Sequence, residues 1–172
     1  MFSLPPSVAA QEVFSDGFDA GDGCGWSVEV DGNDSEGSAT QLADTGDCDT
    51  SDVVFSNTLH PIGEVDFFTF LVVDEFGCPM EPSLTVNSDV SVEVCAYAEC
   101  VTGTAVLTCP GTEVEDTSPM GRPGCCAAAP SMQVDLLLDI DCMGTLDDSS
   151  DIWVRIEDPL NNCVHYSAQG NP

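Results

Sequence analysis

The segment VEVDGND, at residues 28–34, gathers oxygen-bearing side chains of the kind that bind a metal ion. Glu29, Asp31, Asn33 and Asp34 lie within it, and no basic residue is near. Calcium prefers six to eight oxygen ligands, and alternate side chains of an extended segment point to one side. Glu29, Asp31 and Asn33 are therefore predicted to converge on one calcium ion. The alternative is a solvated loop, because Asp, Asn and Gly also dominate turns for reasons of backbone geometry.

A second acidic series follows at Asp44, Asp47, Asp49 and Asp52. These side chains also offer oxygen ligands, but their spacing does not match that of an EF-hand loop. We therefore place the predicted calcium site in the first segment.

The charge of the chain restricts its partners. Its 31 acidic residues face only Arg122 and Arg155, with no lysine, and the formal net charge is −29 over 172 residues. A surface of this sign excludes binding to nucleic acid or anionic lipid. Self-repulsion of this size destabilises a compact state unless cations or salt screen it. A calcium-rich or saline setting is expected, and a salt-adapted acidic surface without a specific site is the alternative.

Ten cysteines in so short a chain predict disulfides and an oxidising compartment, because no C-x-x-C metal spacing is present. We expect Cys24 to pair with Cys48 in the N-terminal part, Cys95 with Cys100, and Cys142 with Cys163. The adjacent pair Cys125–Cys126 predicts two bridges that run in different directions. The cysteines are Cys24, Cys48, Cys78, Cys95, Cys100, Cys109, Cys125, Cys126, Cys142 and Cys163.

Strand patterns dominate the chain from Val53 onward. DFFTFLVVD, at residues 66–74, has apolar side chains on both faces and predicts a central strand. Two segments alternate cleanly and predict one dry and one wet face, with Val134, Leu136, Leu138 and Ile140 on the dry face of the first, and Ile152, Val154 and Ile156 on that of the second. These two segments span residues 133–140 and 151–158. The remaining strands are predicted at residues 53–56, 83–86, 91–97, 104–108 and 163–168.

The sum is roughly eight strands, which predicts an all-β antiparallel sandwich stapled by disulfides. Residues 53–172 form the predicted core, residues 28–52 an acidic linker with the candidate calcium site, and residues 1–27 an irregular N-terminal extension. The extension is interpreted as the remnant of a signal peptide or as a disordered leader. No apolar run approaches the ~20 residues that span a bilayer, so membrane insertion is not expected.

Two motifs resemble a known family. DGNDSEGSATQL at residues 31–42 and IGEVDFFTF at residues 62–70 are similar to the two signature segments of bacterial pre-peptidase C-terminal domains. Gly32 stands where the family has proline, and Glu64 where it has the first aspartate of its second motif. The matching residues are Asp31, Asn33, Asp34, Ser35, Ala39, Thr40 and Leu42, followed by Gly63, Asp66, Phe67, Phe68 and Phe70.

The resemblance implies a jelly-roll-like sandwich that serves secretion, surface attachment or substrate binding without catalysis of its own. The cysteine-rich stretch is similar to disulfide-bearing variants in secreted myxobacterial proteins, and residues 13–27 are similar to a segment that recurs in secreted bacterial proteins. Both similarities imply an extracellular or cell-surface location in bacteria.

The resemblance also implies a ligand set for calcium. Collagen-binding domains of clostridial collagenases have a calcium site written roughly as E-x-E-x-N-D, and Glu29, Asp31, Asn33 and Asp34 match that order. Glu64 and Asp66, at the start of the predicted central strand, are the candidates that complete the shell from across the fold.

Candidate catalytic groups are few. His60 precedes a proline in an apparent turn, and His165 lies in a terminal strand, where a structural histidine is the expected role. We therefore predict that the chain is not an enzyme. Two roles remain open: an adhesion or binding module for an extracellular ligand, with Trp26, Tyr97 and Trp153 as candidate contact residues, or a structural subunit that assembles with copies of itself into a fibre or matrix.

Overall fold

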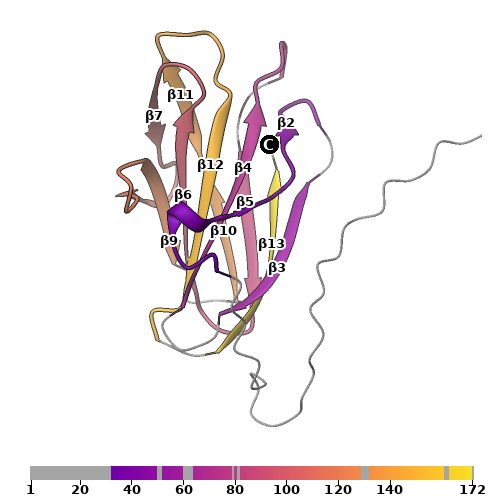
Figure 1. Ribbon diagram of the computed structural model, residues 1–172, viewed down its shortest axis with the longest axis vertical. Coiled ribbons are helices and arrows are strands. Elements are labelled where there is room, and N and C mark those ends of the chain that lie inside the picture. The colour runs from indigo at the N-terminus through magenta and orange to yellow at the C-terminus, as the bar shows by residue number, and fades with distance from the viewer. Residues whose placement is uncertain are drawn as a thin grey trace, which may run out of the picture.

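The fold is a two-layer β-sandwich (Figure 1). The computed structural model describes residues 32–49, 52–59, 64–78, 80, 82–128, 132–160 and 163–171. The predicted leader at residues 1–27, together with Cys24, Glu29, Asp31 and His60, lies outside these ranges. Among the described residues, no helix is both long and apolar enough to cross a membrane.

The first layer is a seven-stranded sheet in the order β1-β4-β12-β6-β9-β8, with β2 also paired to β4. A short 3-10 helix, η1 (Glu36–Ser38), precedes it. The strands are β1 (Thr40–Gln41), β2 (Thr45–Gly46), β4 (Val65–Val73), β6 (Glu93–Cys100), β8 (Val114–Thr117), β9 (Pro123–Ala128) and β12 (Ser150–Glu157).

The second layer is a four-stranded sheet in the order β10-β5-β13-β3, and β11, which follows β10 in the chain, pairs with β7 in a separate two-stranded sheet. Leu138 separates β10 from β11, and its amide donates to the carbonyl of Pro82 at 3.0 Å, next to the last β10-β5 pair, Leu137 with Ser83. The strands are β3 (Val53–Leu59), β5 (Ser83–Ser88), β7 (Thr104–Thr108), β10 (Gln133–Leu137), β11 (Asp139–Met143) and β13 (Val164–Asn171).

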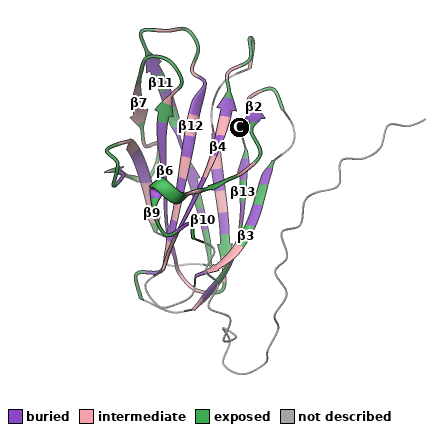
Figure 2. Ribbon diagram, in the orientation of Figure 1, coloured by how far each residue is buried: buried purple, intermediate pink, exposed green. Residues whose placement is uncertain are grey.

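The core lies between the two sheets, where alternate residues of the facing strands are buried (Figure 2). The predicted dry faces are confirmed, because Val134, Leu136, Leu138 and Ile140 are buried, as are Ile152, Val154 and Ile156. Burial of such side chains is the main favourable term in folding. An all-β, disulfide-stapled sandwich is therefore the fold of this chain.

β4 is an interior strand of its sheet but not the central one, because β12 lies on one side of it and only the two-residue strands β1 and β2 lie on the other. Its outer face is covered only in part. Phe67 is buried there with Cys95 and Tyr97, while Val73 at the far end of the strand is 40% exposed. The cover over Phe67 includes Ala39, from the segment predicted to be an irregular linker. That segment also supplies β1 and β2, which pair in parallel with β4.

Four disulfides join the described strands and loops: Cys48–Cys78, Cys95–Cys126, Cys100–Cys142 and Cys109–Cys125. The predicted pairs Cys24–Cys48, Cys95–Cys100 and Cys142–Cys163 are wrong. Cys48 instead ties the acidic linker to the loop after β4, and Cys95 faces Cys126 in the β6-β9 ladder. Cys163 is also disulfide-bonded. The two directions predicted for Cys125 and Cys126 are confirmed.

Candidate cation-binding site

The described part of the predicted calcium segment lies beside the start of β4. The carbonyl of Asn33 accepts a hydrogen bond from the amide of Phe67 at 2.9 Å, and Asn33 is only 1% exposed. Asp34 follows it on the surface, just before η1. The structure thus places Asn33 beside Phe67, the residue that follows Asp66 in β4.

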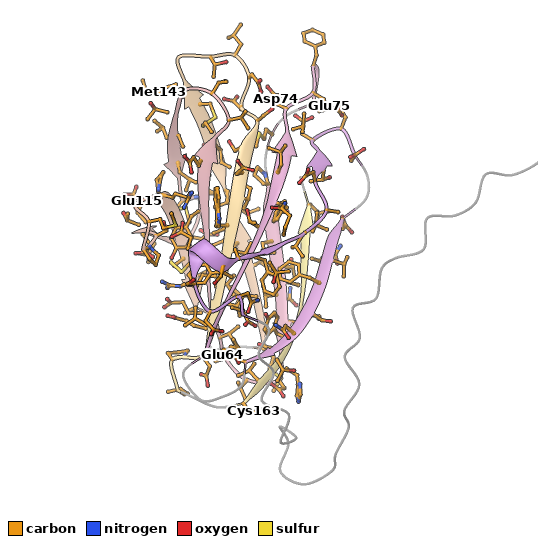
Figure 3. The ribbon with its side chains drawn as sticks, in the orientation of Figure 1. Glu64, Asp74, Glu75, Glu115, Met143 and Cys163 are labelled. Carbon is orange, nitrogen blue, oxygen red and sulfur yellow. A yellow bond between two sulfur atoms is a disulfide. The ribbon has the colours of Figure 1, made fainter. Side chains whose placement is uncertain are left out.

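Among the predicted ligands that the structure describes, Asp66 is the most buried, with 0% exposure. It lies in β4 on the face that points toward the second sheet, as do Phe68 and Phe70. Its Oδ2 accepts a hydrogen bond from the hydroxyl of Tyr166, on β13 in that sheet. A buried carboxylate is costly unless it is hydrogen-bonded, paired with a cation or bound to a metal. Glu64, one residue before the strand, is half-buried at the same end of the sandwich (Figure 3).

A further buried carboxylate lies at this end of the sandwich and was missed from the sequence. Asp158 is 7% exposed and follows β12, whose residue Ile156 lies opposite Asp66 in the ladder. Its Oδ1 accepts a hydrogen bond from the amide of Leu160 at 2.8 Å. Asp158 continues the buried series of Ile152, Val154 and Ile156, and that alternation is the signal that marks it as an inward-facing acid.

Both arginines of the chain are engaged on the outer face of the seven-stranded sheet. Arg122 contacts Glu36 Oε1 at 2.6 Å and Glu99 Oε2 at 2.7 Å, and its guanidinium lies 3.7 Å from the ring centroid of Trp153. Glu36 is buried there and also accepts hydrogen bonds from the Ser118 hydroxyl and the Met120 amide. This ion pair fastens η1 onto the turn between β8 and β9.

Arg155 occupies the centre of a second acidic group on the same face. Its Nη2 contacts Glu93 at 2.7 Å and Glu157 at 3.4 Å, opposite each other on neighbouring strands. Burial raises the pKa of the Glu157 carboxyl, and a hydrogen bond with Glu93 adds to the increase, against the attraction of Arg155. Arg155 also lies 6.0 Å from the ring centroid of Tyr97.

The two candidate aromatic contacts that the structure describes, Tyr97 and Trp153, do not form an open surface. Tyr97 is fully buried, and its hydroxyl donates to Asp116 at 2.9 Å. Burial raises the pKa of this hydroxyl, which keeps it a donor. Trp153 is covered in part by Arg122, and Trp26 lies outside the described residues. Direct ligand contact through Tyr97 is therefore not supported.

The second acidic series serves the backbone. Asp44 accepts from the Leu71 amide at 3.2 Å, Asp47 from the Glu75 amide at 2.9 Å and Asp49 from the Gly46 amide at 3.0 Å. These bonds hold β2 and the following turn against β4. Asp52 instead accepts a hydrogen bond from the Gln169 side chain.

Among the described residues, the groups of three or more His, Cys, Asp or Glu side chains with ligand atoms within 4.8 Å of one another are Asp47 with Cys48 and Cys78, and Glu93 with Cys95 and Cys126. Glu64, Asp66 and Asp158 do not form such a group. Each pair of sulfurs is already joined in a disulfide. Because a metal binds a thiolate and not a disulfide sulfur, neither group is a metal site.

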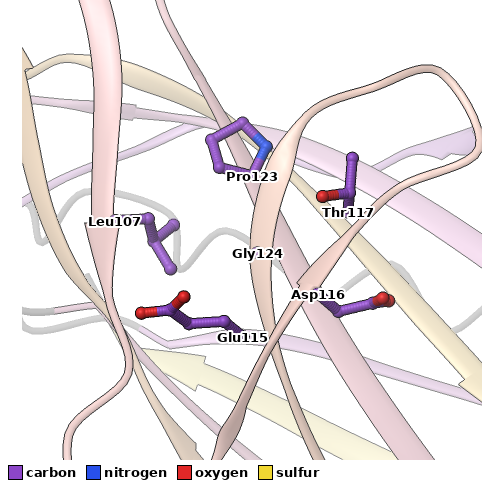
Figure 4. A pocket seen from close by; sticks show the side chains of 6 residues that line it. All are labelled: Leu107, Glu115, Asp116, Thr117, Pro123 and Gly124. Carbon is purple, nitrogen blue, oxygen red and sulfur yellow. The ribbon is translucent and has the colours of Figure 1, made fainter.

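A hollow of about 300 Å³ opens between β7 and the β8-β9 pair (Figure 4). Leu107 and Glu115 face it from its two sides, and Asp116, Thr117, Pro123 and Gly124 complete the lining. The lining contains no basic or nucleophilic group beyond the Thr117 hydroxyl. His165, the described histidine, lies elsewhere on β13, where its Nδ1 is 2.9 Å from the Thr58 hydroxyl.

Comparison of the chain with protein-family models, with characterised proteins and with solved structures finds no match. The resemblance to pre-peptidase C-terminal domains stays a prediction that rests on the two motifs. The fold itself, a disulfide-stapled all-β sandwich, stands on the strand pairing and core described above.

Proposed function

We propose that the chain is a secreted, non-catalytic β-sandwich module that binds calcium and attaches to an extracellular or cell-surface ligand. The observation that carries the proposal is the burial of Asp66 beside Asn33. These two residues come from motifs that are separate in the sequence, and both are oxygen donors predicted to share one ion.

The donor set favours calcium among common metals. Carboxylate and amide oxygens suit hard cations, whereas zinc and copper favour nitrogen and sulfur. Asp158 adds a third buried oxygen donor at the same end of the sandwich. Glu29, Asp31, Asp34 and Glu64 would supply the outer part of the shell. Both arginines are engaged on the outer face of the seven-stranded sheet, so calcium would provide the positive charge in the interior.

The disulfides support an extracellular setting. Several bridges in one small domain are typical of proteins that fold in an oxidising compartment. A calcium-rich exterior also supplies the cation that a chain of net charge −29 needs to offset its self-repulsion.

The test is a thermal melt of the oxidised protein with calcium, with magnesium at the same ionic strength, and with neither. A ligand that binds only the native state stabilises it by RT ln(1 + [L]/Kd), so calcium at about 100 times Kd contributes about 2.7 kcal/mol. We expect a rise in Tm with calcium alone. Equal shifts with the two ions would reduce the acidic residues to a screened, salt-adapted surface.

A matched pair of variants assigns the site. Asp66→Asn keeps the shape of the side chain and removes one charge, as does Asp139→Asn at an exposed position of β11. We expect the calcium-dependent rise in Tm to be lost in Asp66→Asn and kept in Asp139→Asn. If both variants respond to calcium as the unmodified protein does, Asp66 is not a ligand.

The second candidate role is a subunit of an extracellular fibre or matrix. Within the described residues, β3 and β10 end the four-stranded sheet, and a strand edge is a template for pairing with another chain. Analytical ultracentrifugation in millimolar calcium separates the two roles. Large ordered assemblies would favour the fibre subunit, while a persistent monomer favours the binding module.

A further inference from the structure

Three loops meet at the end of the sandwich far from Asp66. They comprise residues 74–78 after β4, residues 101–103 between β6 and β7, and residues 144–149 between β11 and β12. Figure 3 shows Asp74, Glu75 and Met143 at this end and Glu64 and Cys163 at the other.

The loops are tied to one another at their bases. The Asp74 amide donates to the Ser149 hydroxyl at 2.9 Å, and the Asp148 amide donates to Asp74 Oδ2 at 3.1 Å. The Val101 amide donates to the Ser149 carbonyl at 2.9 Å. The disulfides Cys100–Cys142 and Cys48–Cys78 anchor the same region covalently. The loops therefore form one connected platform.

Large apolar side chains project from this platform into solvent. Phe76 and Leu146 have relative exposures of 107% and 99%, and Val101 and Met143 are more than half exposed. Phe76, Val101 and Leu146 lie on the three loops, and Met143 is the last residue of β11. Isolated apolar side chains on a surface are ordinary, whereas these four are gathered on connected loops at one end of the sandwich, and gathered exposed apolar side chains are typical of interaction sites.

The same loops carry charge of one sign. Asp74, Glu75, Asp147 and Asp148 lie among residues 74–78 and 144–149, and these loops contain no lysine, arginine or histidine. A partner must therefore accept apolar side chains at its centre and offset negative charge at its rim. Complementary charge of this kind steers association and selects against other partners.

We propose that Phe76, Leu146, Met143 and Val101 form a docking surface for a protein whose apolar pockets are bordered by lysine or arginine side chains. A second copy of this chain is disfavoured, since it would bring two acidic rims together. Anionic lipid is disfavoured for the same reason. Because the platform is held by disulfides and hydrogen bonds, binding orders little additional chain.

This inference rests on the proposed role of the chain as a binding module, but not on the proposed calcium site. The two lie at opposite ends of β4, which spans Val65–Val73. Loss of calcium binding with intact docking would reject only the site at Asp66, and the reverse result would reject only the docking surface.

The experiment measures binding of the intact oxidised chain to a fluorescently labelled leucine–lysine peptide, which forms a helix with a leucine face bordered by lysines. An alanine–lysine peptide of equal charge is the control for plain electrostatic attraction. Binding is measured at low salt and at about 1 M NaCl, where the Debye length is about 3 Å. The double variant Phe76→Ser, Leu146→Ser is compared with Val54→Ser, Leu160→Ser, which changes two exposed apolar residues elsewhere.

We expect the unmodified chain to prefer the leucine–lysine peptide at both salt concentrations. The variant at Phe76 and Leu146 should bind it at least about tenfold more weakly, while the variant at Val54 and Leu160 keeps its affinity. Equal affinities of the two variants would overturn the proposal, as would equal binding of the two peptides. It would also be overturned by equally tight binding to phosphatidylcholine vesicles, or by self-association that the Phe76 and Leu146 changes abolish.

Discussion

The hydroxyl of Tyr166 donates a hydrogen bond to the carboxylate of Asp66 across the interior of the sandwich. It joins β13 of one sheet to β4 of the other by a polar contact in the interior. The Tyr166 ring also packs against Phe68, with ring centroids 6.4 Å apart, and this contact holds the hydroxyl in position for the hydrogen bond.

Replacing Tyr166 with phenylalanine should therefore destabilise the fold. The change removes a donor from a buried carboxylate and leaves the ring in place, at a cost of about 1–3 kcal/mol. Urea unfolding measures the difference. Thr85→Val is the control, because it removes an exposed hydrogen bond to Asp135 and should cost less than about 0.5 kcal/mol. Equal losses in the two variants would show that the Tyr166 bond has no special weight.

The two carboxylates on Arg122 should differ widely in their contribution to stability. The Glu36 side chain is 1% exposed, and the Glu99 side chain is 58% exposed. Glu36→Ala leaves a partly buried guanidinium and the Met120 amide without their acceptor, so a loss of about 3–5 kcal/mol is expected. Glu99→Ala should cost about 0–1 kcal/mol. Chemical denaturation of both variants gives the comparison, and similar losses would contradict a special role for Glu36 in fastening η1.

Gly124 should tolerate no side chain, because it lies beneath Tyr97. A Cβ at this position would be 2.3 Å from Tyr97 Cδ1 and 2.5 Å from the Ala96 carbonyl oxygen. The backbone carbonyl cannot move aside within the β6-β9 ladder, so Gly124→Ala should destabilise by about 1–3 kcal/mol or more. Gly37→Ala is the matched control, since a Cβ at Gly37 would meet no atom within 4 Å. Unfolding midpoints of the two variants that coincide would refute the steric argument.

The pH dependence of stability should respond in opposite directions to two aspartates. Burial, and then Glu99 and Asp44, raise the pKa of Asp151. The folded state therefore binds the Asp151 proton more tightly than the unfolded state does. The stabilisation that results is lost as the pH rises from about 4. Hydrogen bonds from Ser149 lower the pKa of Asp147, so its contribution is present at neutral pH and lost on acidification.

From pH 4 to pH 7, the free energy of unfolding of Asp151→Asn should accordingly rise relative to that of the unmodified chain. From pH 3 to pH 7, the free energy of unfolding of Asp147→Asn should fall relative to that of the unmodified chain. Denaturant unfolding at about three pH values measures both changes. The same slope for the two variants would contradict the opposite shifts of their pKa values.

The sequence predicted the inner faces of the sandwich better than its edges. Alternation at Val134 to Ile140 and at Ile152 to Ile156 reports burial directly, because successive side chains of a strand point to opposite sides. β8 and β9 were missed, since VEDT and PGCCAA contain no such alternation. β9 takes its place by pairing with β6, and β8 by pairing with β9, which are properties of the folded chain and not of these residues alone.

Disulfide pairing failed for a related reason. Cys95 faces Cys126 only because β6 and β9 are neighbours, and Cys48 reaches Cys78 only because β2 runs beside β4. The separation of the cysteines along the sequence predicts neither of these strand pairings. Asn33 lies close to the start of β4, so the two motifs that were expected to meet are neighbours in the fold. Asp158, the last residue of the predicted strand at residues 151–158, was missed because a polar residue at a strand end is typical of the beginning of a turn.

The parallel pairing of β1 and β2 with β4 has a mechanical consequence. The described chain enters beside the start of β4 at Asn33 and leaves at Asn171, near β2 at the other end of the sandwich (Figure 1). Tension between these two points pulls along the strands, so the hydrogen bonds between the linker and β4 are loaded together in shear instead of opening one by one. Beyond them, the covalent bond between Cys48 and Cys78 stops further extension of the linker. An attachment module with this arrangement would hold its load without unravelling from its N-terminal side.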